Sequence, residues 1–259
     1  MPKYNYHTHT YRCGHAIGED EEYILAAIEA GYTVLGFSDH SPYRDFPHPR
    51  EHMDISQFDE YLSSLKALKE KYKGQIDIRI GLESEFFEFN REEREELRSK
   101  VEYMILGQHF DSPYDGHISY FKPNSEEEIL DYGESVCRGL ESGLFTYLAH
   151  PDVFMNRQHE FTAACKQTAH LIASKAEKLK IPMELNVRGA SKGKFQFGDE
   201  EEFFYPHKDF WKIVSHYDVD CVIGIDAHDP KDLLDKDNIK AVYDEVADLN
   251  LHIIEEPFI

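Results

Sequence analysis

Residues 3–10 read KYNYHTHT: a short candidate strand, Lys3–Tyr6, is followed at once by His7 and His9. Successive side chains of an extended chain point to opposite sides, so residues two apart share a side. The two imidazoles therefore face the same way at the end of a strand. Imidazole is a common ligand for zinc, iron and related metals, so the pair predicts a metal-binding strand end.

The same arrangement recurs along the chain, where short apolar runs alternate with helix-like stretches. The candidate strands are Lys3–Tyr6, Val34–Ser38, Ile76–Ile80, Tyr103–Leu106, Phe145–Ala149, Met183–Asn186 and Cys221–Ile225. The candidate helices are Glu21–Ala30, Ile55–Tyr72, Ser125–Glu141, Phe161–Lys180, Lys208–His216 and Ile239–Leu249. This alternation is typical of βα units around a parallel sheet. It predicts an α/β barrel with one βα unit fewer than the usual eight.

Six of the seven candidate strands carry a histidine or an acid at or just after their C-terminal end. In a closed barrel these ends form one ring at the mouth. The candidate ligands are His7, His9, His15, His40, Glu83, His109, His150, Asp226 and His228. One metal ion takes at most about six protein ligands, so this set predicts two or three ions with a bridging carboxylate. Alternation puts Glu83 and Glu85 on the same side of the chain, so both are candidates for the bridge.

The charge balance argues against long nucleic acid as a partner. The formal net charge is −22 at pH 7, with 50 acidic and 28 basic residues. Proteins that bind DNA or RNA backbones usually present basic patches, because phosphates are neutralised by Lys and Arg. We therefore expect a small substrate, which a local basic pocket in an acidic protein can still bind.

Other features of the composition predict a folded cytoplasmic protein. Hydrophobic residues make up 41% of the 259 residues, and no apolar run reaches the roughly 18 residues that span a bilayer. Residues 1–6 lack the basic-then-apolar pattern of a signal peptide. The cysteines are scattered and form no CxxC pair, so we expect no disulfide framework and a reducing compartment: Cys13, Cys137, Cys165 and Cys221.

At these residues the sequence resembles the PHP (polymerase and histidinol phosphatase) superfamily. The matching motifs are His7-Thr8-His9-Thr10, Ser38-Asp39-His40, Gly81-Leu82-Glu83, Ala149-His150-Pro151 and Asp226-Ala227-His228. They occur in the right order across almost the whole chain. The resemblance implies a single distorted (βα)7 barrel domain over residues 1–259, TIM-like, with its metal site at the C-terminal mouth. The Gly-x-Glu motif also favours Glu83 over Glu85 as the bridge.

The resemblance further implies a division of the ligands among three metals. The first would be held by His7, His9, Glu83 and Asp226; the second by Glu83, His109 and His150; the third by His15, His40 and His228. Zinc, manganese and iron all suit imidazole with carboxylate, and the residues do not choose among them.

Two stretches resemble the histidinol-phosphate phosphatase branch of the superfamily: residues 12–16 and residues 186–189. This likeness implies a phosphomonoesterase that hydrolyses L-histidinol phosphate to histidinol and phosphate, in histidine biosynthesis. Three alternatives stay open: a nucleotide phosphatase or phosphodiesterase on the same metals, an amidohydrolase-like hydrolase, and a metal-binding protein without catalysis. A catalytically inactive relative is expected to have gaps in the ligand set, and the sequence has none.

The expected mechanism is in-line attack on phosphorus by a metal-bridging hydroxide held by Glu83 and Asp226. A phosphate dianion also favours guanidinium partners, so we expect Arg157 and Arg188 to bind the phosphate. Weaker candidates are Arg12, Arg44, Lys192 and Lys194, which lie in loops at the mouth. Asp152, Asp229 or a metal-bound water could be the general acid, and Asp39 could orient an imidazole. The loop Ser41–Asp54 and the aromatic stretch Phe195–Tyr205 could shape the alcohol pocket.

Overall fold

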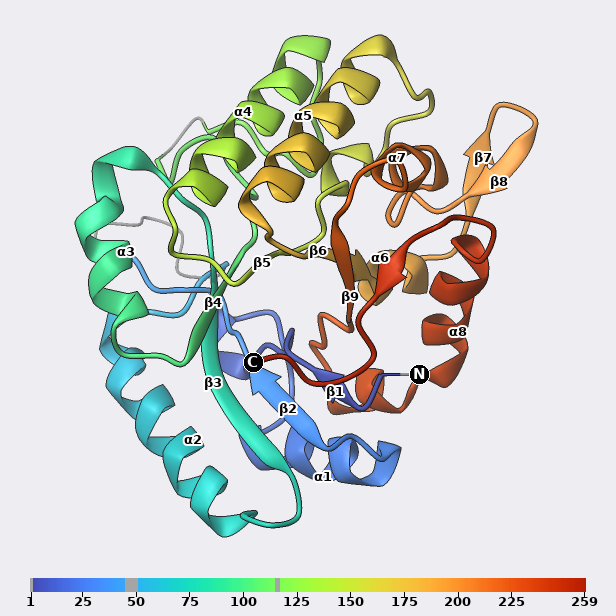
Figure 1. Ribbon diagram of the computed structural model, residues 1–259. Coiled ribbons are helices and arrows are strands. Elements are labelled where there is room, and N and C mark those ends of the chain that lie inside the picture. Colours follow the sequence, from blue (N-terminus) through green and yellow to red (C-terminus); the bar gives the residue numbers. More distant parts are fainter. Residues whose placement is uncertain (1, 45–50, 115–116) are drawn as a thin grey trace.

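The computed structural model describes residues 2–44, 51–114 and 117–259 (Figure 1). Residues 45–50, in the middle of the loop that the sequence analysis placed near the alcohol pocket, lie outside the described ranges. Within those ranges, no helix combines the length and the apolar composition that crossing a membrane requires.

The core of the molecule is one curled parallel sheet. Its strands, in spatial order, are β1 (Tyr4–Asn5), β2 (Val34–Phe37), β3 (Asp77–Ser84), β4 (Tyr103–Leu106), β5 (Tyr147–Leu148), β6 (Met183–Asn186), β9 (Asp220–Gly224) and β10 (His252–Ile253). The seven predicted strands are all present in sequence order. The short strand β10 was not predicted; it pairs with the start of β9.

The sheet curls round so that the chain after β1 meets the chain after β9. The backbone N–H of His9 donates to the carbonyl of Ala227 at 2.9 Å, and the N–H of Ala227 donates to the carbonyl of His7 at 3.1 Å. This contact joins the first and last units at the C-terminal ends of the strands. The structure therefore confirms the predicted α/β, TIM-like barrel. It also brings the pair His7 and His9 next to the pair Asp226 and His228.

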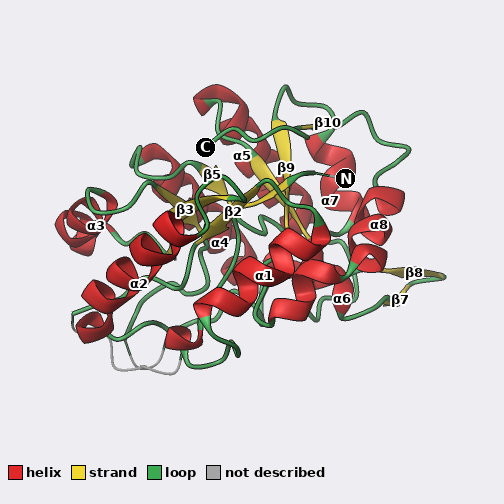
Figure 2. Ribbon diagram, turned by 90° about the horizontal axis from the view of Figure 1, so that it is seen from below, coloured by secondary structure: helices red, strands yellow, loops and turns green. Residues whose placement is uncertain are grey.

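Helices surround the sheet in Figures 1 and 2. They are α1 (Asp20–Ala30), α2 (Phe58–Lys71), α3 (Arg91–Arg98), α4 (Glu126–Glu141), α5 (Ala163–Leu179), α6 (Val187–Ser191), α7 (Lys208–Val214) and α8 (Lys236–Glu245). Helix α3 was not predicted, because almost all residues of this helix are charged and show no apolar periodicity. The sequence analysis also missed α6, which is only five residues long, and the projecting hairpin of β7 (Phe195–Phe197) and β8 (Glu200–Glu202).

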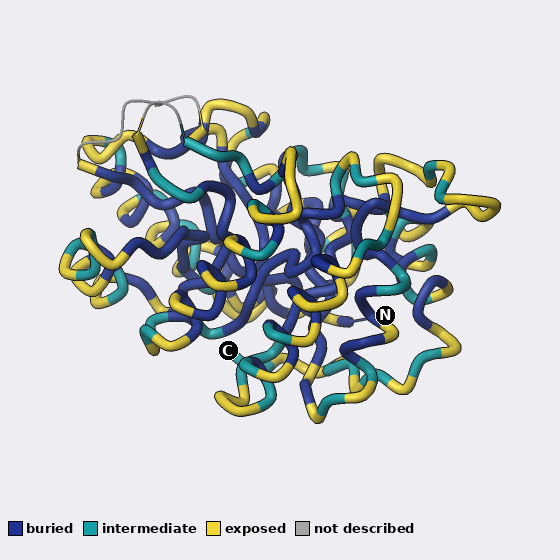
Figure 3. Tube along the Cα trace, turned by 90° about the horizontal axis from the view of Figure 1, so that it is seen from above, coloured by how far each residue is buried: buried dark blue, intermediate teal, exposed yellow. Residues whose placement is uncertain are grey.

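Aromatic side chains fill the barrel below the mouth. Tyr103 is fully buried there, and its hydroxyl donates to the carbonyl of Tyr6 at 2.6 Å. The ring of Phe258, near the C-terminus, packs edge-on against Tyr4 and Tyr6 with centroid distances of 5.7 and 5.1 Å. In Figure 3 the centre of the molecule is accordingly drawn as buried. Aromatic rings thus close this end of the barrel. The histidine and carboxylate side chains lie at the opposite, C-terminal end of the strands.

Replacing Gly81 with Ala is expected to lower the free energy of unfolding by about 1–3 kcal/mol, the usual cost of overpacking a core. A Cβ at Gly81 would lie 2.5 Å from two ring carbons of Tyr103, which cannot retreat because its hydroxyl is bonded to Tyr6. Chemical denaturation would measure the change. Gly133→Ala, where the nearest atom is a side-chain methyl carbon at 3.1 Å, should change stability by less than about 1 kcal/mol. Equal effects in the two variants would contradict the overpacking argument.

Candidate metal centre

His7 and His9 lie just beyond β1 and share a site with two carboxylates. The Nε2 atom of His7 is 3.4 Å from Glu83 Oε2 and 3.6 Å from Asp226 Oδ1. The Nε2 atom of His9 is 3.4 Å from the same Glu83 oxygen and 3.2 Å from the same Asp226 oxygen. Tetrahedral ligands at about 2.0–2.2 Å from a metal are separated by roughly 3.4 Å, which matches these spacings.

The four atoms of this group are buried, and among the described residues none has a hydrogen-bond partner. Buried polar atoms without partners are costly and rare in native proteins. Their convergence at metal-ligand spacing is typical of the donor atoms of a metal site. The geometry of these four atoms therefore fits a divalent cation.

A second group lies on the other side of Glu83. The Nε2 atoms of His109 and His150 are 3.3 and 2.8 Å from Glu83 Oε1, and they are 3.3 Å from each other. Glu83 thus presents one oxygen to each group. Gly107 makes room for it, because a Cβ at that position would lie 2.0 Å from Glu83 Oε1.

The remaining predicted ligands form a third group at the outer side of the cluster. His15, His40 and His228 place ligand atoms within 4.8 Å of one another, and His15 is exposed while the other two are buried. His40 Nδ1 is also 3.2 Å from Glu83 Oε2, which links this group to the first. The structure therefore brings all nine predicted ligands into one continuous cluster.

Carboxylates behind the histidines orient their rings. Glu184 accepts from His7 Nδ1 at 2.8 Å, and Glu85 accepts from His109 Nδ1 at 2.6 Å. A carboxylate bonded to the far nitrogen fixes the tautomer that presents Nε2 to a metal. Glu85 therefore differs from Glu83 in position: it lies behind a histidine and also accepts from the Tyr43 hydroxyl at 2.6 Å. The sequence analysis missed Glu184; a lone acid within the buried strand β6 was the signal for it.

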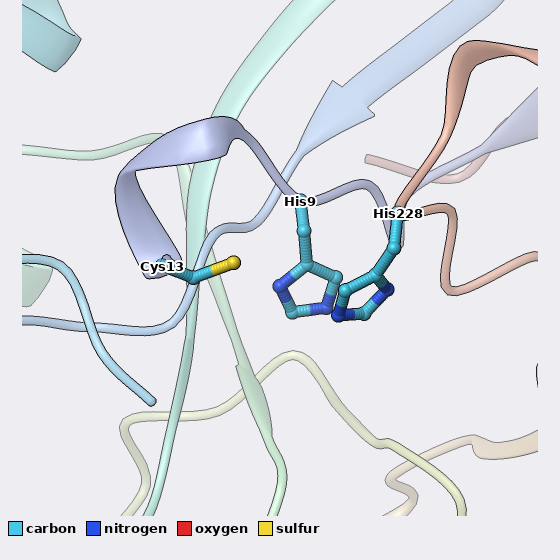
Figure 4. A group of neighbouring side chains, drawn as sticks. All are labelled: His9, Cys13 and His228. Carbon is cyan, nitrogen blue, oxygen red and sulfur yellow. The ribbon is translucent and has the colours of Figure 1, made fainter. Parts of the chain in front are cut away.

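Cys13 is another neighbour that the sequence analysis did not assign to the centre. Figure 4 shows its sulfur pointing toward the imidazole of His9, on the edge away from His228. The rings of His9 and His228 stack with a centroid distance of 4.0 Å. Burial would raise the pKa of the Cys13 thiol, but hydrogen bonds from His15 and His9 lower it below its usual value. The thiol thus contributes a polar contact to the far side of His9.

The electrostatics of the cluster are dominated by its carboxylates. Burial alone would lower the pKa of His7, yet Glu184 and Asp226 raise it to about 10. Burial likewise opposes protonation of His109, yet its neighbour Glu83 brings the pKa to about 10. Conversely, burial and the nearby His9 lower the pKa of His228 to about 4. The carboxylates thus favour positive charge on His7 and His109. A metal ion that binds these imidazoles must displace their protons.

A cavity of about 550 Å³ opens over this cluster. Its lining includes seven of the nine predicted ligands, namely His15, His40, Glu83, His109, His150, Asp226 and His228. Of the predicted phosphate-binding residues, Arg188 lines the cavity, whereas Arg157 is exposed and is not among the lining residues. Lys192 and Tyr205 also line it.

The two aspartates considered as general acids have other partners. Asp152 is fully buried, and its Oδ2 accepts from the backbone N–H of His207 at 2.7 Å and from Trp211 Nε1 at 3.0 Å. Burial raises the pKa of Asp152 to about 7. Asp229 caps the short 3-10 helix Pro230–Leu234 and accepts from the N–H of Lys231 at 3.1 Å. Neither aspartate is among the residues that line the cavity.

Comparisons with known proteins agree on one family. A family model described as a PHP domain matches residues 5–188. A Deinococcus radiodurans protein named "Probable histidinol-phosphatase" is 27% identical over 233 residues, 86% of this chain and 85% of that protein. The histidinol-phosphatase of Bacillus subtilis is 31% identical over 153 residues, 55% of this chain and 53% of its own.

A solved structure supports the fold. Histidinol phosphate phosphatase from Lactococcus lactis, in complex with zinc, L-histidinol and phosphate, matches with a TM-score of 0.73. The match covers 98% of this chain and 95% of that one, at 17% sequence identity.

Proposed function

The chain belongs to the PHP domain family, and from this premise we propose that it is a metal-dependent phosphomonoesterase that hydrolyses L-histidinol phosphate to histidinol and phosphate. The observation that carries the proposal is the set of buried, unpartnered histidine and carboxylate atoms around Glu83 and Asp226. The proposed substrate is taken from the names of the relatives, which are called histidinol-phosphatase.

We assign the predicted ligands to three sites, two of which share Glu83. His7, His9, Glu83 and Asp226 would hold one ion, Glu83, His109 and His150 a second, and His15, His40 and His228 a third. Two or three divalent ions, of zinc, manganese or iron, suit this donor set. When bound, such ions make water a nucleophile near neutral pH and neutralise charge on the phosphoryl oxygens.

The protein's own side chains would orient these ligands and bind the ester. Glu184 and Glu85 hold the rings of His7 and His109, so their Nε2 atoms face the centre. Arg188, with a side chain that is 35% exposed, offers its guanidinium to the phosphate in the cavity. Arg157 stays a proposed second contact, which would have to reach the substrate from outside the lining residues.

We also propose a single barrel domain over residues 1–259 and a cytoplasmic location for the enzyme. All four cysteines are buried and free. Free thiols fit a reducing compartment, in which a biosynthetic phosphatase would meet its small phosphorylated substrate.

The proposal is tested by measuring phosphate release from L-histidinol phosphate, a panel of mononucleotides and a phosphodiester, with protein whose bound metal has been quantified. We expect strong preference for L-histidinol phosphate, and loss of that activity in His7→Ala, because His7 would ligate a metal. Turnover of nucleotides alone would keep the metal centre but refute the substrate. No turnover of any phosphoester by metal-loaded protein would refute the phosphoesterase function and favour an amide substrate.

A further inference from the structure

Beside the metal centre, one corner of the cavity holds a buried tyrosine bonded to a lysine. Lys192 directly follows α6, and its Nζ donates to the hydroxyl of Tyr205 at 2.6 Å. The same Nζ lies 4.7 Å from the centroid of the tyrosine ring. Both side chains line the cavity that also contains Arg188 and Asp226. The proposed function assigns no role to either residue.

The tyrosine is held rigidly. Tyr205 is only 2% exposed, and its ring lies against the backbone of Gly189. A Cβ at Gly189 would lie 2.3 Å from Cδ2 of Tyr205 and 2.0 Å from its carbonyl oxygen, so only glycine allows this approach. The hydroxyl is thus fixed at the cavity by packing, as a group taking part in catalysis needs to be.

The direction of the hydrogen bond leaves the tyrosine proton available. The Lys192 ammonium has only donors, so Tyr205 Oη is the acceptor of that bond. The hydroxyl proton of Tyr205 is therefore not used in this bond, and Tyr205 lines the same cavity as the candidate metal ligands. The two aspartates considered for proton transfer do not line this space, whereas Tyr205 does.

An alkyl phosphate ester needs such a donor. When the P–O bond to an alcohol breaks, the leaving oxygen becomes a strongly basic alkoxide unless a proton reaches it in the transition state. A positioned general acid typically contributes about 10²–10⁴-fold to such a step.

We propose, on the basis of the proposed function, that Tyr205 is the general acid for the leaving alcohol and that Lys192 returns its proton. As water oxygen bonds to phosphorus and the P–O ester bond breaks, the Tyr205 hydroxyl proton moves to the departing oxygen. A proton of the Lys192 ammonium moves to the tyrosine oxygen along their hydrogen bond. The proton released by the attacking water balances the one that Lys192 takes back from solvent, so the sum is ester plus water to alcohol plus phosphate.

Burial shifts the pKa of both groups, upward for Tyr205 and downward for Lys192. Burial raises the pKa of Tyr205, so its hydroxyl carries its proton at neutral pH. Burial lowers the pKa of Lys192, with nearby Arg188 acting in the same direction, and Asp226 opposes them. A lysine that gives up its proton more readily than usual suits a group that reprotonates a tyrosinate.

The test compares leaving groups. For the wild type and Tyr205→Phe, kcat would be measured on L-histidinol phosphate, on glycerol 2-phosphate and on p-nitrophenyl phosphate, whose phenolate leaves without protonation. We expect Tyr205→Phe to lower kcat on both alkyl esters by about 10²-fold or more, and on the nitrophenyl ester by less than about threefold. Bound metal and inhibition by inorganic phosphate should stay at wild-type values.

Equal losses on all three esters, or no loss on any, would overturn the proposal, because a merely structural tyrosine would not distinguish the leaving groups. Lys192→Met should show the same dependence on the leaving group with a smaller loss. Lys194→Ala is the matched control: Lys194 lies in the same loop, but it pairs with Glu245 at 2.5 Å and, unlike Lys192, is not among the residues that line the cavity. It should behave as wild type.

The experiment separates this proposal from the proposed substrate. If the wild type hydrolyses glycerol 2-phosphate and p-nitrophenyl phosphate but not L-histidinol phosphate, the substrate assignment fails while the two other esters still test Tyr205. If Tyr205→Phe shows no such selectivity while the wild type prefers L-histidinol phosphate, the general acid is wrong and the function stands.

Discussion

Replacing Glu83 with Gln is expected to lower kcat by roughly 10³-fold or more, since several kcal/mol of transition-state stabilisation are lost at about 1.4 kcal/mol per tenfold. Glu83 offers Oε2 to His7 and His9 and Oε1 to His109 and His150, so it connects two proposed metal sites. An amide cannot supply two anionic oxygens. We therefore also expect the variant to lose at least one equivalent of bound metal, measured by elemental analysis beside the kinetics.

Glu85→Gln is the matched control, because Glu85 is also about 1% exposed and lies two residues away. It accepts from His109 and Tyr43 and is bonded to His52 at 3.1 Å, so it would act through the rings that it holds and not as a ligand. Changes to such orienting groups typically cost about 10–100-fold. A larger loss of metal in Glu85→Gln than in Glu83→Gln would show that Glu85 is the bridge. Circular dichroism on both variants would establish that they are folded.

Replacing Arg188 with Ala is expected to lower kcat/KM for the phosphate ester by about 10–100-fold, the usual worth of a hydrogen bond to a charged group. Arg188 lines the cavity, and within the described residues its ion pair with Asp232 is a distant one, at 3.9 Å. The guanidinium of Arg188 can therefore turn toward a phosphate. Inhibition by inorganic phosphate should weaken in parallel, because that anion would lose the same contact.

Arg157→Ala provides the comparison. Arg157 is exposed and does not line the cavity, so a contact that it makes from outside the lining residues should contribute less than about threefold to kcat/KM. A large loss in Arg157→Ala would make it a main phosphate contact and would show that the loop after His150 approaches the substrate closely. Unchanged kinetics in Arg188→Ala would contradict a phosphate site on that side of the cavity.

Some features of the molecule follow from local sequence alone. The spacing of His7 and His9, and of Asp226 and His228, is a period-two signal that survives in any extended chain. Because parallel strands present their C-terminal ends at one edge, strand ends identified one by one also predict a shared site. This is why the barrel and the cluster of ligands could be inferred without contacts. The charged helix α3 and the five-residue helix α6 carry no such periodic signal, and they were missed.

Other features depend on distances between residues far apart in sequence. Alternation put Glu83 and Glu85 on the same side, but β3 ends at Ser84, so the rule no longer holds at Glu85. Its carboxylate lies behind His109 instead of between the metal sites. Likewise, the sequence could not rank Arg157 against Arg188, since both come after strands. Only the folded chain decides which of them reaches the cavity.

The sequence by itself determined the barrel, the ring of ligands and their chemical class, because strand periodicity and residue type are local properties. The tertiary structure decided which carboxylate lies between the histidines, which cationic side chains line the cavity, and that Tyr205 packs on Gly189. The physical reason is that these roles depend on ångström-scale contacts between separate loops. Such contacts are set by packing of the whole chain, and no spacing along the sequence encodes them.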